Sequence, residues 1–200
     1  MKKILGRKMG KKRFCAVIIC SVLVTVLGLG LILYPQATDV GYVLSQIKIG
    51  GLKINNGAAA NASENDVQVP EGAVCKLIIP EIGLETNVLE GTSQDVLKKG
   101  PGHYEETPLP GKEGNCAIAG HRTMHGHPFR HIDRLDQGDE IIVFTPDGKY
   151  VYRVIDKKVV EPTDLSVIES GEEAQLTLTA CHPVGSARQR LVVIAELEED

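Results

Sequence analysis

Three residue types that together support acyl transfer stand at the ends of apolar runs. Cys181 closes the alternating run Leu176–Ala180, His121 follows the apolar run Ala117–Gly120, and Arg190 opens a third apolar run. A cysteine thiolate can attack a carbonyl carbon, an imidazole can move the proton, and a guanidinium can stabilise the oxyanion. The pattern favours a nucleophilic cysteine. Because cysteine is also often buried, an inert structural role for Cys181 is the alternative.

These residues need a β framework to hold them, and short β-rich runs separated by turns begin at about Pro70. Within Thr145–Lys149, Asp-Gly predicts a tight hairpin, because these residues tolerate positive φ. Short helices are expected over Ser93–Lys99 and Pro128–Leu135. So many strands in one domain favour a single antiparallel sandwich or barrel. The expected strands are Val74–Ile79, Thr86–Leu89, Asn115–Gly120, Asp139–Thr145, Lys149–Lys158, Gln175–Cys181 and Leu191–Leu197.

An uncharged segment near the N-terminus, Phe14–Tyr34, is twenty-one residues long. As a helix it matches the roughly 30 Å hydrocarbon core of a bilayer. The cluster of basic residues before it predicts a cytoplasmic N-terminus, with everything after Tyr34 outside the cytoplasm. A cleaved signal peptide is the alternative, but its apolar region is usually shorter and ends in a small-residue cleavage site.

The charge is divided along the chain. The 200 residues carry 22 Lys and Arg against 26 Asp and Glu, but the first seven basic residues all precede the apolar segment. The remainder therefore holds 15 basic residues against 26 acidic ones. Such an acidic body argues against a nucleic-acid partner. A hydrophobic content of 42% and a charged content of 24% exclude disordered, fibrous and polytopic membrane proteins.

The chain divides into four predicted segments. Residues 1–13 form a basic cytoplasmic tail, 14–34 a transmembrane anchor, 35–69 a stalk or linker, and 70–200 the folded domain. Within the stalk, apolar spacing allows a short helix from Thr38 to Ile54, which Gly50 and Gly51 would break. The small polar residues 55–66 are typical of a flexible linker.

Outside the apolar segment the chain has three cysteines. Cys75 and Cys116 each open an apolar strand, so we expect them to be buried as small hydrophobic residues. A disulfide between these two cysteines is left open.

Four closely spaced histidines, His121, His125, His127 and His131, raise the question of a metal site. No neighbouring ligand completes a known spacing, and Gly126 interrupts any helix that would align them. We expect no metal site, and we place these histidines in a loop and a short helix beside the active site.

Three ordered motifs resemble the sortases, the cysteine transpeptidases of Gram-positive cell surfaces. They are GHR at 120–122, TLTACHP at 177–183 and RLVV at 190–193, and the hairpin FTPDGKYVYRV at 144–154 supports them. The resemblance covers roughly residues 70–199 and implies an eight-stranded closed β-barrel with short helices, here preceded by one transmembrane helix.

By this resemblance Cys181 is the nucleophile, His121 the acid and base, and Arg190 the group that stabilises the oxyanion or orients the substrate. Arg188 is the rival for that last role, because residues two apart face the same side of a strand. We favour Arg190, which directly precedes the Leu-Val-Val run as the family's arginine does.

The resemblance also implies the reaction and its partners. A surface protein with a C-terminal Leu-Pro-x-Thr-Gly-like sorting signal is cleaved after Thr through a thioester, then joined to an amine of a peptidoglycan precursor. The implied location is the cell membrane, single-pass, with the catalytic domain outside. No cofactor is implied, and calcium binding by the acidic loops is left open. The alternatives are a hydrolytic cysteine endopeptidase and a non-catalytic β-barrel binding module.

Among sortases, the Cys-x-Pro sequence and the short barrel look most like class D. His182-Pro183 and the stretch Ser186–Arg190 resemble class E. Ala180 departs from the family, which usually carries Thr immediately before the cysteine. No Asp-Pro-aromatic lid motif occurs in residues 35–75, which argues against the class that polymerises pilins.

Overall fold

The computed structural model describes residues 11–50 and 68–198. Its contacts form two compact units that divide between Ala37 and Thr38. The helix α1, Lys11–Gly50, runs through this division. In the first unit most described side chains of α1 are exposed and apolar, and α1 contains a stretch long and apolar enough to cross a bilayer. The expected anchor at 14–34 lies within this helix.

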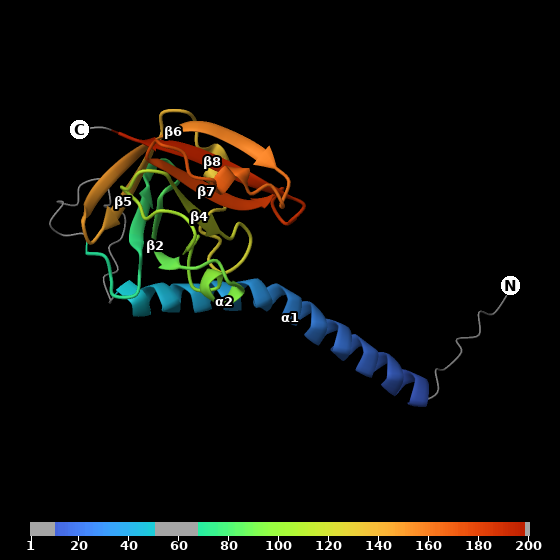
Figure 1. Ribbon diagram of the computed structural model, residues 1–200. Helices are drawn as coiled ribbons and strands as arrows, with labels where there is room; N and C mark the ends of the chain where they lie inside the picture. The colour runs from blue at the N-terminus through green and yellow to red at the C-terminus, as the bar shows by residue number, and fades with distance from the viewer. Residues whose placement is uncertain (1–10, 51–67, 199–200) are drawn as a thin grey trace. The chain divides into compact units, whose positions relative to one another are not determined.

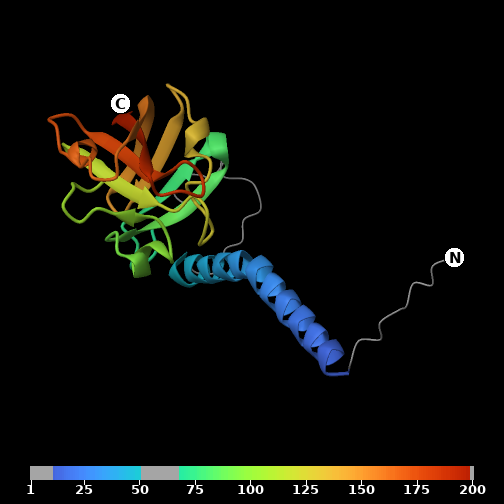
Figure 2. The same cartoon turned by 90° about the vertical axis from the view of Figure 1, so that its right-hand side faces the viewer.

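The second unit is built on an eight-stranded closed barrel, as the resemblance implied. Its order is β1-β2-β3-β4-β7-β8-β6-β5, closed by pairing of β5 with β1. Figures 1 and 2 show the strands curving around one core, with β4, β7 and β8 adjacent in Figure 1. The strands are β1 Cys75–Ile79, β2 Leu84–Glu90, β3 Gly102–His103, β4 Asn115–Gly120, β5 Glu140–Thr145, β6 Gly148–Val160, β7 Gln175–His182 and β8 Gln189–Leu197.

The barrel is not purely antiparallel, so this part of the expectation was wrong. The pairs β2–β3 and β4–β7 are parallel. Parallel neighbours need a long crossover between them, and in the second pair the chain makes β5 and β6 before it returns to β4 as β7. This crossover brings the ends of β4 and β7 to the same edge of the barrel.

The short helices are smaller than expected. The helix α2, Gln94–Leu97, follows Ser93, whose Oγ accepts a hydrogen bond from the amide of Val96. The expected helix over Pro128–Leu135 is only the 3₁₀ turn η4, Ile132–Arg134. The turns η3, Pro80–Ile82, and η5, Ser166–Ile168, are also of this type.

The spacing of buried side chains explains η4. Phe129, Ile132 and Leu135 are all fully buried in the core, and they recur every three residues. A three-residue period matches a 3₁₀ turn, in which residues three apart lie on one face.

The barrel core consists of aliphatic side chains together with Phe129, Tyr152 and two cysteines. Cys75 and Cys116 are both buried in this core as free thiols, which confirms their expected burial. Burial is the main cause that raises the pKa of Cys75 to about 12 and that of Cys116 further.

The C-terminal part of α1, from Thr38, belongs to the same unit as the barrel. Tyr42 Oη lies 2.8 Å from Thr86 Oγ1 on β2. Gln46 accepts a hydrogen bond from the amide of Asn87 at 2.9 Å and donates to the carbonyl of Lys99 at 2.8 Å. These contacts fix one face of the helix to β2 and to the residues after α2. Residues 51–67, with the expected linker, lie outside the described residues.

The same helix also contacts the loop that follows β4. Asp39 Oδ1 accepts a hydrogen bond of 2.9 Å from the amide of Gly126. Gly126 has a φ of 70°, and a Cβ there would lie 2.0 Å from Cδ1 of Tyr42. Only glycine allows the helix to approach this loop so closely.

Candidate active site

Strand register brings the three predicted site residues to one edge of the barrel. Cys181 on β7 lies directly opposite Arg190 on β8, and side chains of such antiparallel partners share a face. On the other side of β7, Gly120 is in register with Ala180 in the parallel pair. His121, the next residue after β4, therefore follows at the level of Cys181.

The glycine before His121 has a packing reason. A Cβ on Gly120 would lie 2.4 Å from Cδ2 of Phe129, whose ring is fully buried. The amide of Phe129 donates a 3.0 Å hydrogen bond back to the carbonyl of His121. The loop after β4 is therefore folded back over Gly120, and this fold fixes the backbone of His121.

The imidazole of His121 is partly sheltered. Its Nε2 is buried and has no hydrogen-bond partner among the described residues. The ring of His125 lies beside it, with the two ring centroids 5.3 Å apart and an angle of 45° between the ring planes. Burial, and after it the charge of His125, lower the pKa of His121. A lowered pKa keeps the imidazole neutral at neutral pH, the form that can accept a proton from a thiol.

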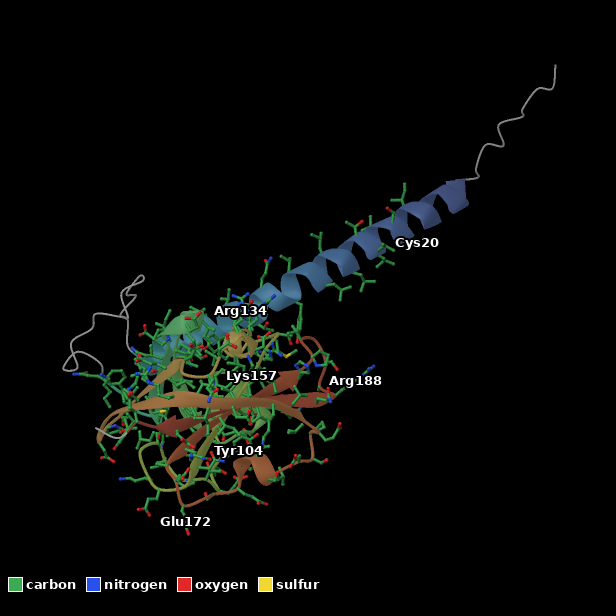
Figure 3. All side chains as sticks on the ribbon, turned by 90° about the horizontal axis from the view of Figure 1, so that it is seen from above. Cys20, Tyr104, Arg134, Lys157, Glu172 and Arg188 are labelled. Atoms are coloured by element: carbon green, nitrogen blue, oxygen red, sulfur yellow. The ribbon has the colours of Figure 1, made fainter. Side chains whose placement is uncertain are left out.

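Arg190 and its rival Arg188 occupy different surroundings. Arg190 is partly buried, and its Nη1 donates to the carbonyls of Ala187 and Gln189 at 3.3 and 3.1 Å. Arg188 lies in the loop before β8 and is exposed. In Figure 3 its side chain projects away from the barrel. The structure brings Arg190 together with Cys181 and leaves Arg188 in solvent.

A further residue, Arg122, belongs to this site, although no role was predicted for it. It is only 2% exposed, and its Nη1 lies 3.4 Å from the carbonyl oxygen of Cys181. Its Nη2 forms an ion pair of 2.8 Å with Asp133 of η4. The sequence signal was its place in the GHR motif, directly after His121.

The remaining histidines have structural surroundings. His103 is buried between Glu90, at 2.8 Å from its Nδ1, and the carbonyl of Pro108, at 3.1 Å from its Nε2. His125 and His127 lie in the loop after β4, and His131 precedes η4. Across residues 11–50 and 68–198, no cluster of three or more acidic, histidine or cysteine side chains has the geometry of a metal site.

Ala180 stands where the family usually has Thr, and its surroundings fit a small apolar side chain. It is 3% exposed and belongs to the core of the barrel. Its strand partners are Gly120 and Leu191, so the position before the nucleophile is packed against the core.

Comparison with known proteins points to one family. The model of the sortase domain matches residues 77–198. Sortase D of Bacillus subtilis is 35% identical over 121 residues, which are 58% of this chain and 60% of that protein. Sortase SrtE1 of Streptomyces coelicolor is 36% identical over 140 residues, 62% of this chain and 40% of that protein. The matched region thus spans less than two thirds of either relative.

Solved structures agree. A Sortase D5 transpeptidase of Clostridium perfringens superposes with a TM-score of 0.60 at 27% identity, over 82% of this chain and 98% of that one. Sortase E1 of Streptomyces coelicolor, solved with a tripeptide in its active site, superposes with a TM-score of 0.60 at 32% identity, over 66% of this chain and 92% of that one. The relatives include both class D and class E enzymes, as the motifs predicted.

The domain match covers more than half of the chain, the barrel is the one that the motifs implied, and the three motifs meet at one edge. The chain belongs to the sortase family, whose members are cysteine transpeptidases.

Proposed function

We propose that this chain is a membrane-anchored transpeptidase with Cys181 as nucleophile, His121 as acid and base, and Arg190 as the oxyanion donor. The observation that carries the proposal is the register: Cys181 opposite Arg190, and His121 following the residue paired with Ala180. Family membership supports the same roles. The substrate is a surface protein with a C-terminal Leu-Pro-x-Thr-Gly-like signal.

In the first half-reaction, the neutral imidazole of His121 takes the proton of the Cys181 thiol. The thiolate attacks the carbonyl carbon of the substrate Thr, and the guanidinium of Arg190 donates to the oxygen that becomes negative. His121 then protonates the nitrogen of the following Gly. The Thr–Gly bond breaks, which leaves a thioester on Cys181 and releases the C-terminal fragment.

In the second half-reaction, an amine of a cell-wall precursor attacks the thioester. His121 accepts a proton from this amine and returns it to the departing sulfur of Cys181. A new amide bond forms at the substrate Thr, the C–S bond breaks, and the enzyme regains its starting state.

The proposed location follows from the N-terminal region. The basic residues before the apolar part of α1 favour a cytoplasmic N-terminus, which places the barrel outside the membrane. Sorting-signal proteins and precursor amines would meet the enzyme there. The anchoring of surface proteins, rather than pilus assembly, is supported by residues 35–75, which contain no Asp-Pro-aromatic lid motif.

The test uses the full chain in detergent micelles with a Leu-Pro-Gln-Thr-Gly peptide and an excess of oligoglycine or diaminopimelate. Mass spectrometry identifies the products. We expect a new Thr–amine bond with the wild-type chain and none with Cys181→Ala. We expect Arg190→Ala to lower kcat/KM by about 100- to 1,000-fold, the range seen when one oxyanion donor is removed.

Arg188→Ala is the matched control, because it removes an exposed guanidinium two residues away. It should stay within about threefold of the wild-type rate, since exposed charges contribute little. Cleavage without transfer, for every amine tried, would identify a hydrolytic endopeptidase. No reaction with this peptide or with Leu-Pro-x-Thr-Ala and Leu-Ala-x-Thr-Gly variants would favour a binding module.

A further inference from the structure

The loop after β4 contains a buried arginine that spans from one strand of the site to the other. Arg122 is 2% exposed, whereas Arg130, Arg134 and Arg188 are exposed. An arginine side chain carries five donors and no acceptor, and burying it is costly unless acceptors and a counter-charge surround it. The surroundings of Arg122 provide both.

The guanidinium is held on one side by the loop itself. Nη2 pairs with Asp133 Oδ1 at 2.8 Å and donates to the carbonyl of Arg130 at 3.2 Å. Asp133 is fixed in turn, because Nζ of Lys157 on β6 donates to its carbonyl at 2.7 Å and to that of Leu135 at 2.6 Å.

On its other side the guanidinium reaches the nucleophile's own backbone. Nη1 lies 3.4 Å from the carbonyl oxygen of Cys181 and 3.4 Å from Nδ1 of His182. Because arginine has only donors, Nδ1 of His182 must act as the acceptor in that contact. One planar group therefore joins the loop that begins with His121 to the end of the strand that carries Cys181.

We infer that Arg122 is a positioning residue for the reaction, which sets the backbone of Cys181 relative to His121 through its contact with the Cys181 carbonyl. This inference rests on the proposed function for the reaction that it serves. Nucleophile and base must be held close to their productive geometry for efficient proton transfer, and a misplacement of about 1 Å can cost 100-fold in rate. A lysine cannot replace Arg122, because one ammonium cannot reach Asp133 and both carbonyls in one plane.

The test compares Arg122→Lys, Arg122→Met and Asp133→Asn with the wild-type full chain in detergent. Rates of peptide transfer are expressed per Cys181 thiol in molecules whose buried Cys75 and Cys116 resist alkylation, so that misfolded protein is excluded. We expect Arg122→Lys to stay folded and to lower kcat about tenfold or more, with KM within about twofold. Asp133→Asn should also lower kcat and leave KM nearly unchanged, with a smaller loss of kcat than Arg122→Lys. Arg130→Gln is the control, since Arg130 contributes only its carbonyl.

A second readout needs no substrate and separates this inference from the proposed function. Amide hydrogen exchange should quicken at the end of β7 around Cys181 in Arg122→Lys, and not in Arg130→Gln. If the wild-type chain transfers no peptide, the proposed function fails while exchange still tests the positioning. Wild-type kcat per thiol with unchanged exchange in Arg122→Lys, or a change in KM alone, would overturn the inference. If Arg122→Met does not fold, Arg122→Lys and Asp133→Asn decide the question.

Discussion

At the scale of single residues, the site combines a sheltered base with a nucleophile at a strand end. His121 has a buried Nε2 and a second imidazole, His125, beside its ring. Burial and the neighbouring charge both disfavour the protonated form of His121, so they act in the same direction. The acid limb of the pH–activity profile should therefore depend on His125, which takes no part in the chemistry.

His125→Asn tests this dependence. Loss of the neighbouring charge and of part of the shelter should raise the pKa of His121. Its neutral form would then appear only at higher pH, so the acid limb of the kcat/KM profile should move to higher pH. NMR titration of the imidazole in a Cys181→Ala background measures the pKa directly. His131→Asn serves as the control, and an unchanged or lower pKa of His121 in His125→Asn would contradict the argument.

Strand register and burial also distinguish arginines that look alike in the sequence. Arg188 and Arg190 were both candidates, and only Arg190 lies opposite Cys181. The spacing of residues assigns no role to Arg122, because its acceptors, Asp133 and the carbonyl of Cys181, lie 11 and 59 positions later in the chain. Such a convergence depends on tertiary contacts, so spacing alone did not reveal it.

At the scale of elements, the sequence predicted seven of the eight barrel strands. The bounds of β4 agree with the prediction, and those of β7 and β8 differ by one or two residues at one end. The strand β3 was missed because its two residues, Gly102 and His103, carry no periodic signal. The parallel pairing of β4 with β7 could not be predicted either, since periodicity describes a strand's faces but not its neighbours.

Gly120 is the last residue of β4, directly before His121, and Gly120→Ala tests its packing against Phe129. The new Cβ would meet the ring of Phe129 at 2.4 Å, so ring and loop must shift. We expect a loss of about 1–3 kcal/mol in the free energy of unfolding, the usual cost of overpacking. Denaturant unfolding followed by circular dichroism measures it. Gly171→Ala is the matched control because a Cβ there meets open space. Equal stability of the two variants would refute the packing argument.

The part of α1 that lies on the barrel gives a second prediction at this scale. Tyr42→Ala removes the contact with Gly126 and the hydrogen bond to Thr86, so we expect about 1–3 kcal/mol of destabilisation. Tyr42→Phe, which loses only the hydroxyl, should cost about 0.5–1.5 kcal/mol. Thermal unfolding of the full chain in detergent compares them. Tyr42→Ala with wild-type stability would show that the helix does not stabilise the barrel.

At the scale of the whole molecule, the thiols differ sharply in accessibility. Cys75 and Cys116 are buried, Cys15 and Cys20 belong to the apolar segment Phe14–Tyr34, and Cys181 is partly exposed. In folded protein within micelles, iodoacetamide should therefore modify one cysteine rapidly, and Cys181→Ala should abolish this fast phase. Intact-mass spectrometry counts the adducts over time. Rapid labelling of Cys75 or Cys116 before unfolding would contradict their burial and the raised pKa of their thiols.

The parallel pairing of β4 with β7 also has a consequence for biosynthesis. Gly120 and Ala180 are partners sixty positions apart, and Arg190 arrives on the last strand. A chain anchored by α1 as proposed leaves the membrane in sequence order, so Cys181 emerges before β8. Long-range pairing of this kind forms slowly, because loop-closure entropy opposes it. We therefore expect the thiol to have neither its arginine nor a completed barrel while the protein is in transit, so that acyl transfer begins only after β8 has joined the barrel.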